Sequence, residues 1–228
     1  MNENAKFKFQ CSAFCWVLFI IFTLMVKFVS VRAIGPNDSE IGFAGLNYLV
    51  NSFINGPNET WYNLSHALTL CGGVMGFLIC CFGVRDVIKA KTFKGLDKRY
   101  YLLAGTYAFL GLVYAFFEIV IVNYRPILVD DVLEASYPSS HCLLAIVVYL
   151  TAARVPELYR KSVKQGRISA IEFKIMAILS VIARVISGYH WATDVIGSVI
   201  LAYAIVFAFD GILEAMPAQK NREVPEQE

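Results

Sequence analysis

The residues of this chain that could carry out chemistry are few, and most stand beside long apolar segments. An apolar run begins directly after the stretch Tyr-Pro-Ser-Ser-His at 137–141. Arg125 precedes it, and Arg184, His190 and Asp194 lie at a second boundary between apolar segments. Ionisable groups at such positions are costly in a membrane, and we therefore treat them as functional candidates.

These residue types suit the binding and transfer of a phosphate. Arginine offers a planar fork of donors to phosphate oxygens. Ser139 and Ser140 stand where a helix is expected to begin, so free backbone N–H groups and the positive end of the helix dipole would meet an anion there. His190 and Asp194 are an i, i+4 pair, in which the carboxylate can hold one ring nitrogen while the other attacks phosphorus. His141 is then placed to protonate the departing oxygen.

The elements that must position these residues are membrane helices. Of the 228 residues, 57% are hydrophobic and only 17% are charged, against about 25% charged in soluble domains. A bilayer-spanning helix needs about 20 apolar residues. A soluble all-α core is the alternative, but it explains neither the block lengths nor the charge distribution. We therefore predict an all-α bundle of six transmembrane helices in a single membrane domain, residues 1–213, at Cys11–Val31, Leu64–Ile88, Tyr100–Asn123, His141–Val155, Ile171–Tyr189 and Trp191–Leu213.

Basic residues are concentrated in alternate connections. They cluster between the second and third blocks and between the fourth and fifth, whereas Arg32 and Arg125 are the only basic residues of the loops at 32–63 and 124–140. The positive-inside rule then predicts that both termini and the tail at 214–228 are cytoplasmic. The outer face is predicted to hold Glu118, Arg125, Ser139, Ser140, His141, Arg184, His190 and Asp194.

The outer loop at 34–63 is the longest connection and could contain a short helix along the membrane surface. Ile41, Leu46, Leu49 and Phe53 fall loosely on one helical face. Such a helix would be an interfacial anchor or a lid over a site. The six cysteines all lie in or beside apolar blocks at spacings unlike a metal site, so we expect neither disulfides nor a bound metal.

Each candidate residue also has a simpler interpretation. A single histidine at a membrane interface is usually a polar residue at the level of the water, and a single arginine at a helix end usually anchors the helix. Anchoring arginines favour the cytoplasmic side, however, and Arg125 and Arg184 are predicted on the other side. The convergence of all these groups on one predicted face favours a site.

The ordered set resembles the type 2 phosphatidic acid phosphatase family of integral-membrane lipid phosphatases. The family pattern is Lys-x6-Arg-Pro, then Pro-Ser-Gly-His, then Ser-Arg-x5-His-x3-Asp. Its first part matches at Arg125-Pro126 and its second at 138–141. The third matches at Arg184, His190 and Asp194 with both spacings kept.

This resemblance implies hydrolysis of a lipid phosphate or diphosphate without a metal or other cofactor. His190 would form a phosphohistidine, Asp194 would orient it, and His141 would be the general acid. Phosphoryl oxygens would be held by Arg125, Arg184, Ser139 and the backbone around Ser140. The expected partners are the lipid substrate and the bilayer, with no nucleic acid, and the expected location is a bacterial cytoplasmic membrane with the site facing outward.

Three positions depart from the family pattern. Ser140 replaces a glycine, Ala183 replaces a serine, and Glu118 stands where the family has lysine. Glu118 could pair with Arg125 or Arg184, could read a hydroxyl or amine of the substrate, or could mark a protein without hydrolytic activity.

Two other functions use the same residues. A phosphotransferase would pass the phosphoryl group from His190 to an alcohol instead of water. A transporter or lipid-binding protein could line a pathway with arginine, histidine and aspartate. Transporters usually show repeats and helices broken near the midplane, whereas these polar residues cluster at one surface, which favours an enzyme.

Overall fold

In the computed structural model, which describes residues 2–92, 95–160 and 162–217, the chain is predominantly helical. This agrees with the predicted all-α class. Two short strands, β1 (Arg32–Ala33) and β2 (Glu40–Ile41), pair antiparallel. The helices of the described chain are α1 (Glu3–Phe28), α2 (Ala44–Ile54), α3 (Glu59–Ala90), α4 (Lys98–Ile119), α5 (Ser140–Ala152), α6 (Val163–Ile186) and α7 (Ala192–Ala215).

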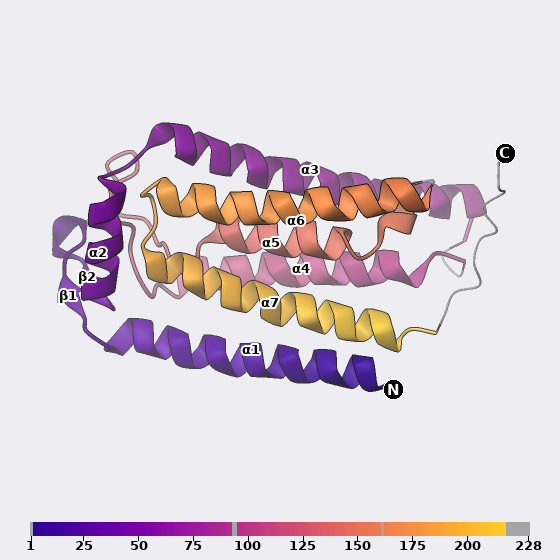
Figure 1. The fold of residues 1–228 in the computed structure, drawn as a ribbon, viewed down its shortest axis with the longest axis horizontal. Coiled ribbons are helices and arrows are strands. Elements are labelled where there is room, and N and C mark those ends of the chain that lie inside the picture. Colours follow the sequence, from indigo (N-terminus) through magenta and orange to yellow (C-terminus); the bar gives the residue numbers. More distant parts are fainter. Residues whose placement is uncertain (1, 93–94, 161, 218–228) are drawn as a thin grey trace.

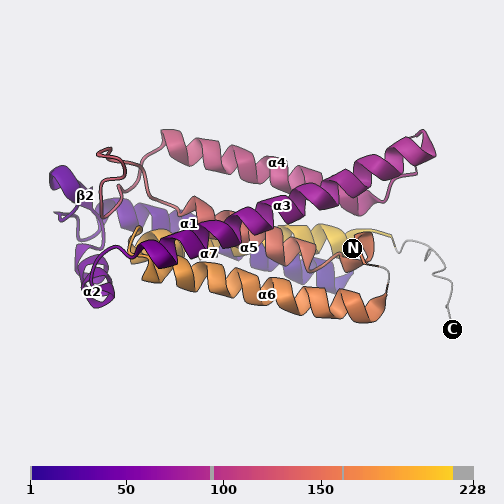
Figure 2. The same cartoon turned by 90° about the horizontal axis from the view of Figure 1, so that it is seen from above.

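Six of these helices run side by side, and α2 lies across one end of the bundle (Figure 1). α1 begins and α7 ends at the opposite end. α5 packs against α3, α6 and α7 and is buried along most of its length, whereas α4 lies at the edge of the bundle (Figure 2). The main core therefore forms around α5 and α7.

Side-chain caps determine where most of the long helices begin. The side-chain oxygens of Asn2, Asn58, Asp97 and Ser162 accept backbone N–H groups in the first turns of α1, α3, α4 and α6. Such caps satisfy donors that a helix leaves free at its start. Ser139 occupies the same position before α5, but its hydroxyl makes no capping bond. The start of α5 therefore retains free donors, at the position where the sequence predicts an anion site.

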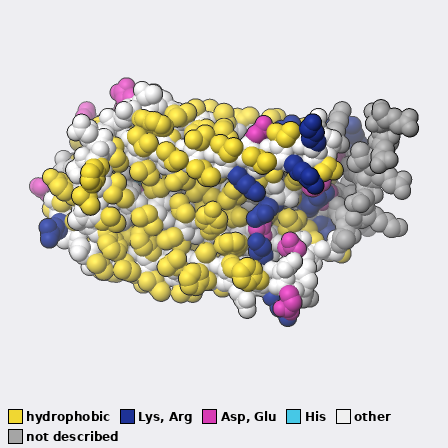
Figure 3. Space-filling view, in the orientation of Figure 1, with side chains coloured by type: hydrophobic (Ala, Val, Ile, Leu, Met, Phe, Trp, Pro, Cys, Tyr) yellow, Lys and Arg dark blue, Asp and Glu magenta, His cyan; other side chains and the backbone are white. Residues whose placement is uncertain are grey.

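Four helices, α1, α3, α4 and α7, are long and apolar enough to cross a membrane. α5 is apolar but has only 13 residues, which gives a length of about 20 Å, and it is enclosed by other helices. α6 has 24 residues but carries charged side chains along its first half. Apolar side chains cover the middle of the molecule, and Lys and Arg gather towards the end away from α2 (Figure 3).

The helices begin and end at different residues from the predicted blocks. α1 starts at Glu3, α3 at Glu59 and α6 at Val163, each before the predicted apolar block. The reason is that each helix begins directly after its capping residue, and that residue lies in the polar sequence before the block. α4 stops at Ile119 instead of reaching Asn123. Of the expected tail at 214–228, residues 218–228 lie outside the described part of the chain.

A helix does form within the loop at 34–63, namely α2. Ile41 was expected on its apolar face but belongs to β2 and is fully buried, whereas Leu46, Leu49 and Phe53 are exposed. The buried side of α2 carries Asn47. Its amide donates to Thr193 Oγ1 over 3.0 Å and accepts the Thr193 N–H over 3.2 Å. α2 is thereby fixed against the first turn of α7, next to His190.

Candidate active site

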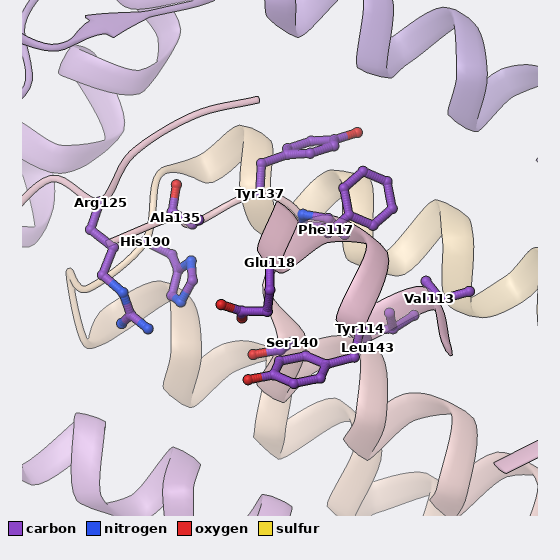
Figure 4. A pocket seen from close by; sticks show the side chains of 12 residues that line it. Val113, Tyr114, Phe117, Glu118, Arg125, Ala135, Tyr137, Ser140, Leu143 and His190 are labelled. Carbon is purple, nitrogen blue, oxygen red and sulfur yellow. The ribbon is translucent and has the colours of Figure 1, made fainter. Parts of the chain in front are cut away.

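The predicted site residues lie at the end of the bundle beside α2. A cavity of about 30 Å³ opens there between the end of α4, the following loop and the starts of α5 and α7. Figure 4 shows Glu118, Arg125 and His190 directed towards this space. Because the cavity has room for only a small group, the tail of a lipid would have to lie outside it. The lining includes Tyr114, Glu118, Arg125, Ser136, Ser140 and His190.

Arg184 is the buried cation of the site. It has no exposed surface, and its nitrogen Nη2 lies 2.8 Å from Nε2 of His190 and 3.2 Å from Nδ1 of His141. Its other terminal nitrogen donates to Ser65 Oγ over 3.1 Å. No carboxylate in the described part of the chain lies within 4.0 Å of it. Arg184 does not itself line the cavity, but it contacts His190, which does. Burying an unpaired charge is costly, so a bound anion nearby would stabilise this guanidinium.

Arg184 also determines which nitrogen of His190 carries the hydrogen. A guanidinium can only donate, so Nε2 of His190 accepts and presents its lone pair. The hydrogen is then on Nδ1, which lies 3.4 Å from Oδ2 of Asp194 but is not well aligned with it. Burial, followed by the charge of Arg184, lowers the pKa of His190 well below its ordinary value. His190 is therefore a neutral imidazole with a nucleophilic nitrogen.

Asp194 is held in place from two sides. Its Oδ2 accepts the N–H of Trp191 over 3.0 Å, and Asn123 Nδ2 lies 3.5 Å from Oδ1. α7 begins at Ala192, so His190 precedes the helix and does not share a helical face with Asp194. The expected i, i+4 helical pair is corrected to a contact between the loop before α7 and the first turn of α7.

Arg125 is positioned by the loop between α4 and α5. Tyr124 and Ala135 form a bridge across this loop, and the N–H of Arg125 donates to the carbonyl of Glu134 over 3.1 Å. The Arg125 Nε also lies 3.0 Å from Glu134 Oε2, although its N–H is not aligned with that oxygen. The buried Nη1 of Arg125 has no partner within the described residues, so it is free to bind an anion.

The start of α5 contributes the hydroxyls. Ser139 is fully buried and its Oγ has no partner in the described chain. Its N–H donates to the carbonyl of Asp194 over 3.2 Å and is not available to a ligand. Ser140 lines the cavity, and the N–H groups of the first turn have no partner inside the helix. At the start of α5, the hydroxyl of Ser139 and the backbone N–H groups that follow it are therefore the donors available to an anion.

Glu118 does not pair with either arginine. In the described chain it has no ion pair, and the partner of Arg125 is Glu134. Glu118 lies in the last turn of α4, which ends at Ile119, whereas Arg125 lies in the loop that follows. Glu118 instead lines the same cavity as Arg125, where its carboxylate accepts a hydrogen bond from the hydroxyl of Tyr114.

Sequence reasoning missed several residues of the site. His66 and Ser65, both on α3, contact His141 and Arg184 respectively. Glu134 and Asn123 support Arg125 and Asp194. His66 did carry a signal, because it lies just inside a helix predicted to begin at the outer face. Within the described residues no group of three or more His, Cys, Asp or Glu has a geometry that could hold a metal ion.

Comparison with known proteins agrees with these motifs. Residues 104–213 match the family model of the PAP2 superfamily. This segment of the chain therefore carries the sequence pattern of the PAP2 superfamily. The matched segment runs from α4 to α7 and contains every residue predicted for the site. His66 and Ser65 lie outside it.

The whole fold is similar to a crystal structure of a transmembrane PAP2-type phosphatidylglycerolphosphate phosphatase from Bacillus subtilis. The TM-score is 0.64 at 20% sequence identity, and the match covers 92% of this chain and 98% of that one. No curated protein sequence matches the chain. The apolar helices and this PAP2 transmembrane fold identify an integral membrane protein with several spans.

Proposed function

We propose that this PAP2 protein hydrolyses a lipid phosphate or diphosphate through a phosphohistidine on His190, without a metal. The observation that carries the proposal is the environment of Arg184. A fully buried guanidinium without a carboxylate donates to both histidines. A phosphoryl group placed there would neutralise this charge and meet the lone pair of His190.

The chemistry proceeds in two steps. Nε2 of His190 attacks phosphorus, the bond from phosphorus to the lipid oxygen breaks, and His141 gives that oxygen a proton. Water then attacks the phosphohistidine, the P–N bond breaks with its electron pair returning to His190, and His141 takes the proton of the water. Arg125, Arg184, Ser139 and the amides after Ser140 hold the phosphoryl oxygens throughout.

The membrane arrangement belongs to the same proposal. The single domain at 1–213 spans a bacterial cytoplasmic membrane six times, with α5 and α6 as the fourth and fifth spans. The connections rich in Lys and Arg lie at the end away from the site (Figure 3), which supports cytoplasmic termini and an outward-facing site. The substrate then reaches the cavity from the outer leaflet with its tail in the lipid.

The test is phosphate release by the detergent-purified protein. A panel of phosphatidic acid, phosphatidylglycerol phosphate and a polyprenyl diphosphate is assayed with EDTA present, beside His190→Ala. A matched control is His190→Gln, which keeps a polar side chain but cannot form the intermediate. We expect release by the wild type only, and acid-labile labelled phosphate on His190.

Other outcomes would contradict the proposal in different ways. Labelled phosphate on His190 without release would indicate a phosphotransferase that lacks its alcohol acceptor. Neither release nor labelling from any lipid would indicate a non-catalytic lipid-binding or transport protein. Activity that EDTA abolishes and a divalent cation restores would reject the metal-independent mechanism.

A further inference from the structure

All three histidines of the chain meet at the site, and one of them has no part in the chemistry described above. His66 lies on α3, and its Nδ1 is 3.3 Å from Nε2 of His141. The two ring centroids are 4.1 Å apart. The ring of Tyr62, one turn earlier on α3, lies 4.3 Å from the ring of His66. His66 is therefore held directly behind the proposed general acid.

The direction of hydrogen bonding in this group is determined by Arg184. The guanidinium donates to Nδ1 of His141, so neutral His141 carries its hydrogen on Nε2. That hydrogen faces Nδ1 of His66, which must accept it. His66 then carries its own hydrogen on Nε2, an atom that is buried and has no partner among the described residues. The chain of donors thus runs from Arg184 through His141 to His66 and ends in a free N–H.

We propose that His66 and His141 share one proton and that His66 is a positioning residue for the general acid. It holds Nε2 of His141 so that Nδ1 faces the phosphoryl site, and it exchanges a proton with that ring. The inference rests on the proposed lipid phosphatase activity and adds a residue that lies outside the matched family segment.

The proton balance shows what His66 supplies. When the bond from phosphorus to the lipid oxygen breaks, Nδ1–H of cationic His141 passes to the leaving oxygen, and His141 becomes neutral with its hydrogen on Nε2. When water attacks the phosphohistidine, its proton goes to Nδ1 and His141 is cationic again. The hydrogen on Nε2 can then shift to Nδ1 of His66, which spreads the charge over two rings.

The charges around the pair determine when it holds this extra proton. His66 faces His141 from α5, Arg184 from α6 and Tyr62 on its own helix, and Tyr62 stacks on Tyr189. Arg125 adds positive charge from the loop. The positive charges of Arg184 and Arg125 disfavour a further cation on these rings. A bound phosphate dianion reverses that field, so the pair gains its proton as the substrate binds.

The test compares leaving groups, because a poor leaving oxygen needs the proton and a good one does not. Wild type, His66→Asn and His66→Ala are assayed on a lipid phosphate and on p-nitrophenyl phosphate. Asn can accept from Nε2 of His141 but cannot carry a proton. We expect both variants to lose about 10²-fold in kcat on the lipid phosphate, with KM unchanged. On p-nitrophenyl phosphate we expect less than about threefold, since nitrophenolate leaves without protonation.

Thr69→Val is the matched control. Thr69 lies on the same helix, and its hydroxyl donates to the carbonyl of Ser65 over 2.8 Å and lies 3.4 Å from the carbonyl of His141. Thr69→Val therefore tests the local packing of α3 on α5 without removing a titratable ring. We expect both activities to stay at the level of the wild type. This control also shows whether weaker packing of α3 is enough to reduce activity on the lipid phosphate more than activity on p-nitrophenyl phosphate.

Three results would overturn the inference while leaving the proposed function intact. They are full activity of His66→Asn on the lipid, equal losses on both substrates, and an effect confined to KM. An inactive wild type, with no phosphate released from either substrate, would reject the phosphatase itself and the role of His66 with it.

Discussion

The guanidinium of Arg184 lies 2.8 Å from Nε2 of His190 and therefore occupies the lone pair that would attack phosphorus. The same nitrogen lies 3.2 Å from His141. One buried cation thus bridges the proposed nucleophile, His190, and the proposed general acid, His141. A phosphoryl group entering the site would draw the guanidinium onto its oxygens and release both rings. Arg184 therefore orients the two histidines, and in the proposed mechanism it also binds the anion.

Arg184→Lys should lose this double function. An ammonium on a flexible chain cannot bridge two rings and Ser65 with a planar fork. We expect kcat/KM for the lipid substrate to fall about 10²- to 10³-fold, with both kcat and KM affected. Arg160→Lys is the control, because Arg160 donates to Ser169 at the other end of the bundle. A loss of less than about threefold in Arg184→Lys would show that charge alone suffices.

Asp194→Asn should leave the fold intact and impair the nucleophile. The amide oxygen can still accept the N–H of Trp191, but it no longer favours a hydrogen on Nδ1 of His190. We expect the rate of His190 phosphorylation to fall about 10³-fold, with an unchanged midpoint of thermal unfolding. Single-turnover labelling and a melting curve measure the two quantities. If the labelling rate is kept, Asp194 serves only as the cap of α7.

The lowered pKa of His190 predicts an acid-tolerant nucleophile. A lowered pKa means that the ring stays neutral as the pH falls through its ordinary value of about 6.5. We expect phosphorylation by p-nitrophenyl phosphate to be nearly as fast at pH 6 as at pH 7.5. A histidine with the ordinary pKa would keep only about a quarter of its neutral form at pH 6. A decline to that level, measured by rapid quench, would contradict burial as the controlling factor.

Glu118→Gln should tighten the binding of inorganic phosphate. Glu118 lines the cavity without an ion-pair partner in the described chain, so its charge repels the anion through partly solvated space. We expect the inhibition constant of phosphate to fall about threefold to tenfold, and the effect to shrink at high salt. Glu157→Gln, at an exposed carboxylate paired with Arg99, is the control. No change in Glu118→Gln would place its charge outside the field of the bound phosphate.

Gly197→Ala should disturb the site through packing alone. A methyl group on Gly197 would stand 2.6 Å from the ring and hydroxyl of Tyr137, which precedes the stretch 138–141. We expect a loss of about 1–3 kcal/mol in stability together with reduced activity. Gly73→Ala on α3 is the matched control, because its methyl meets no atom within 4 Å. Equal melting temperatures for the two variants would show that the ring of Tyr137 can move aside for the methyl group without a loss of stability.

Much of the fold and of the candidate site could be predicted because the relevant signals are local. Apolar blocks long enough to span a bilayer predict helices wherever they occur. The side chains of Arg125, His141 and Arg184 have a charge or a proton-transfer capacity that follows from the residue type alone, so they could be recognised as candidates from the sequence. The helix limits were less predictable, because caps such as Asn58 and Ser162 lie in polar sequence outside the apolar blocks.

The sequence by itself therefore determined which chemical groups the protein has, their order and the short spacing from His190 to Asp194, since covalent geometry limits how far nearby residues can separate. Only the tertiary structure decided which distant groups meet. His66 and His141 are 75 positions apart, and their contact depends on which faces of α3 and α5 pack together. The pairing of Arg125 with Glu134 instead of Glu118 was decided in the same way, by the bridge across one loop. The sequence allows many such contacts between distant residues, and the packing of the helices determines which of them form. A local sequence pattern therefore cannot predict them.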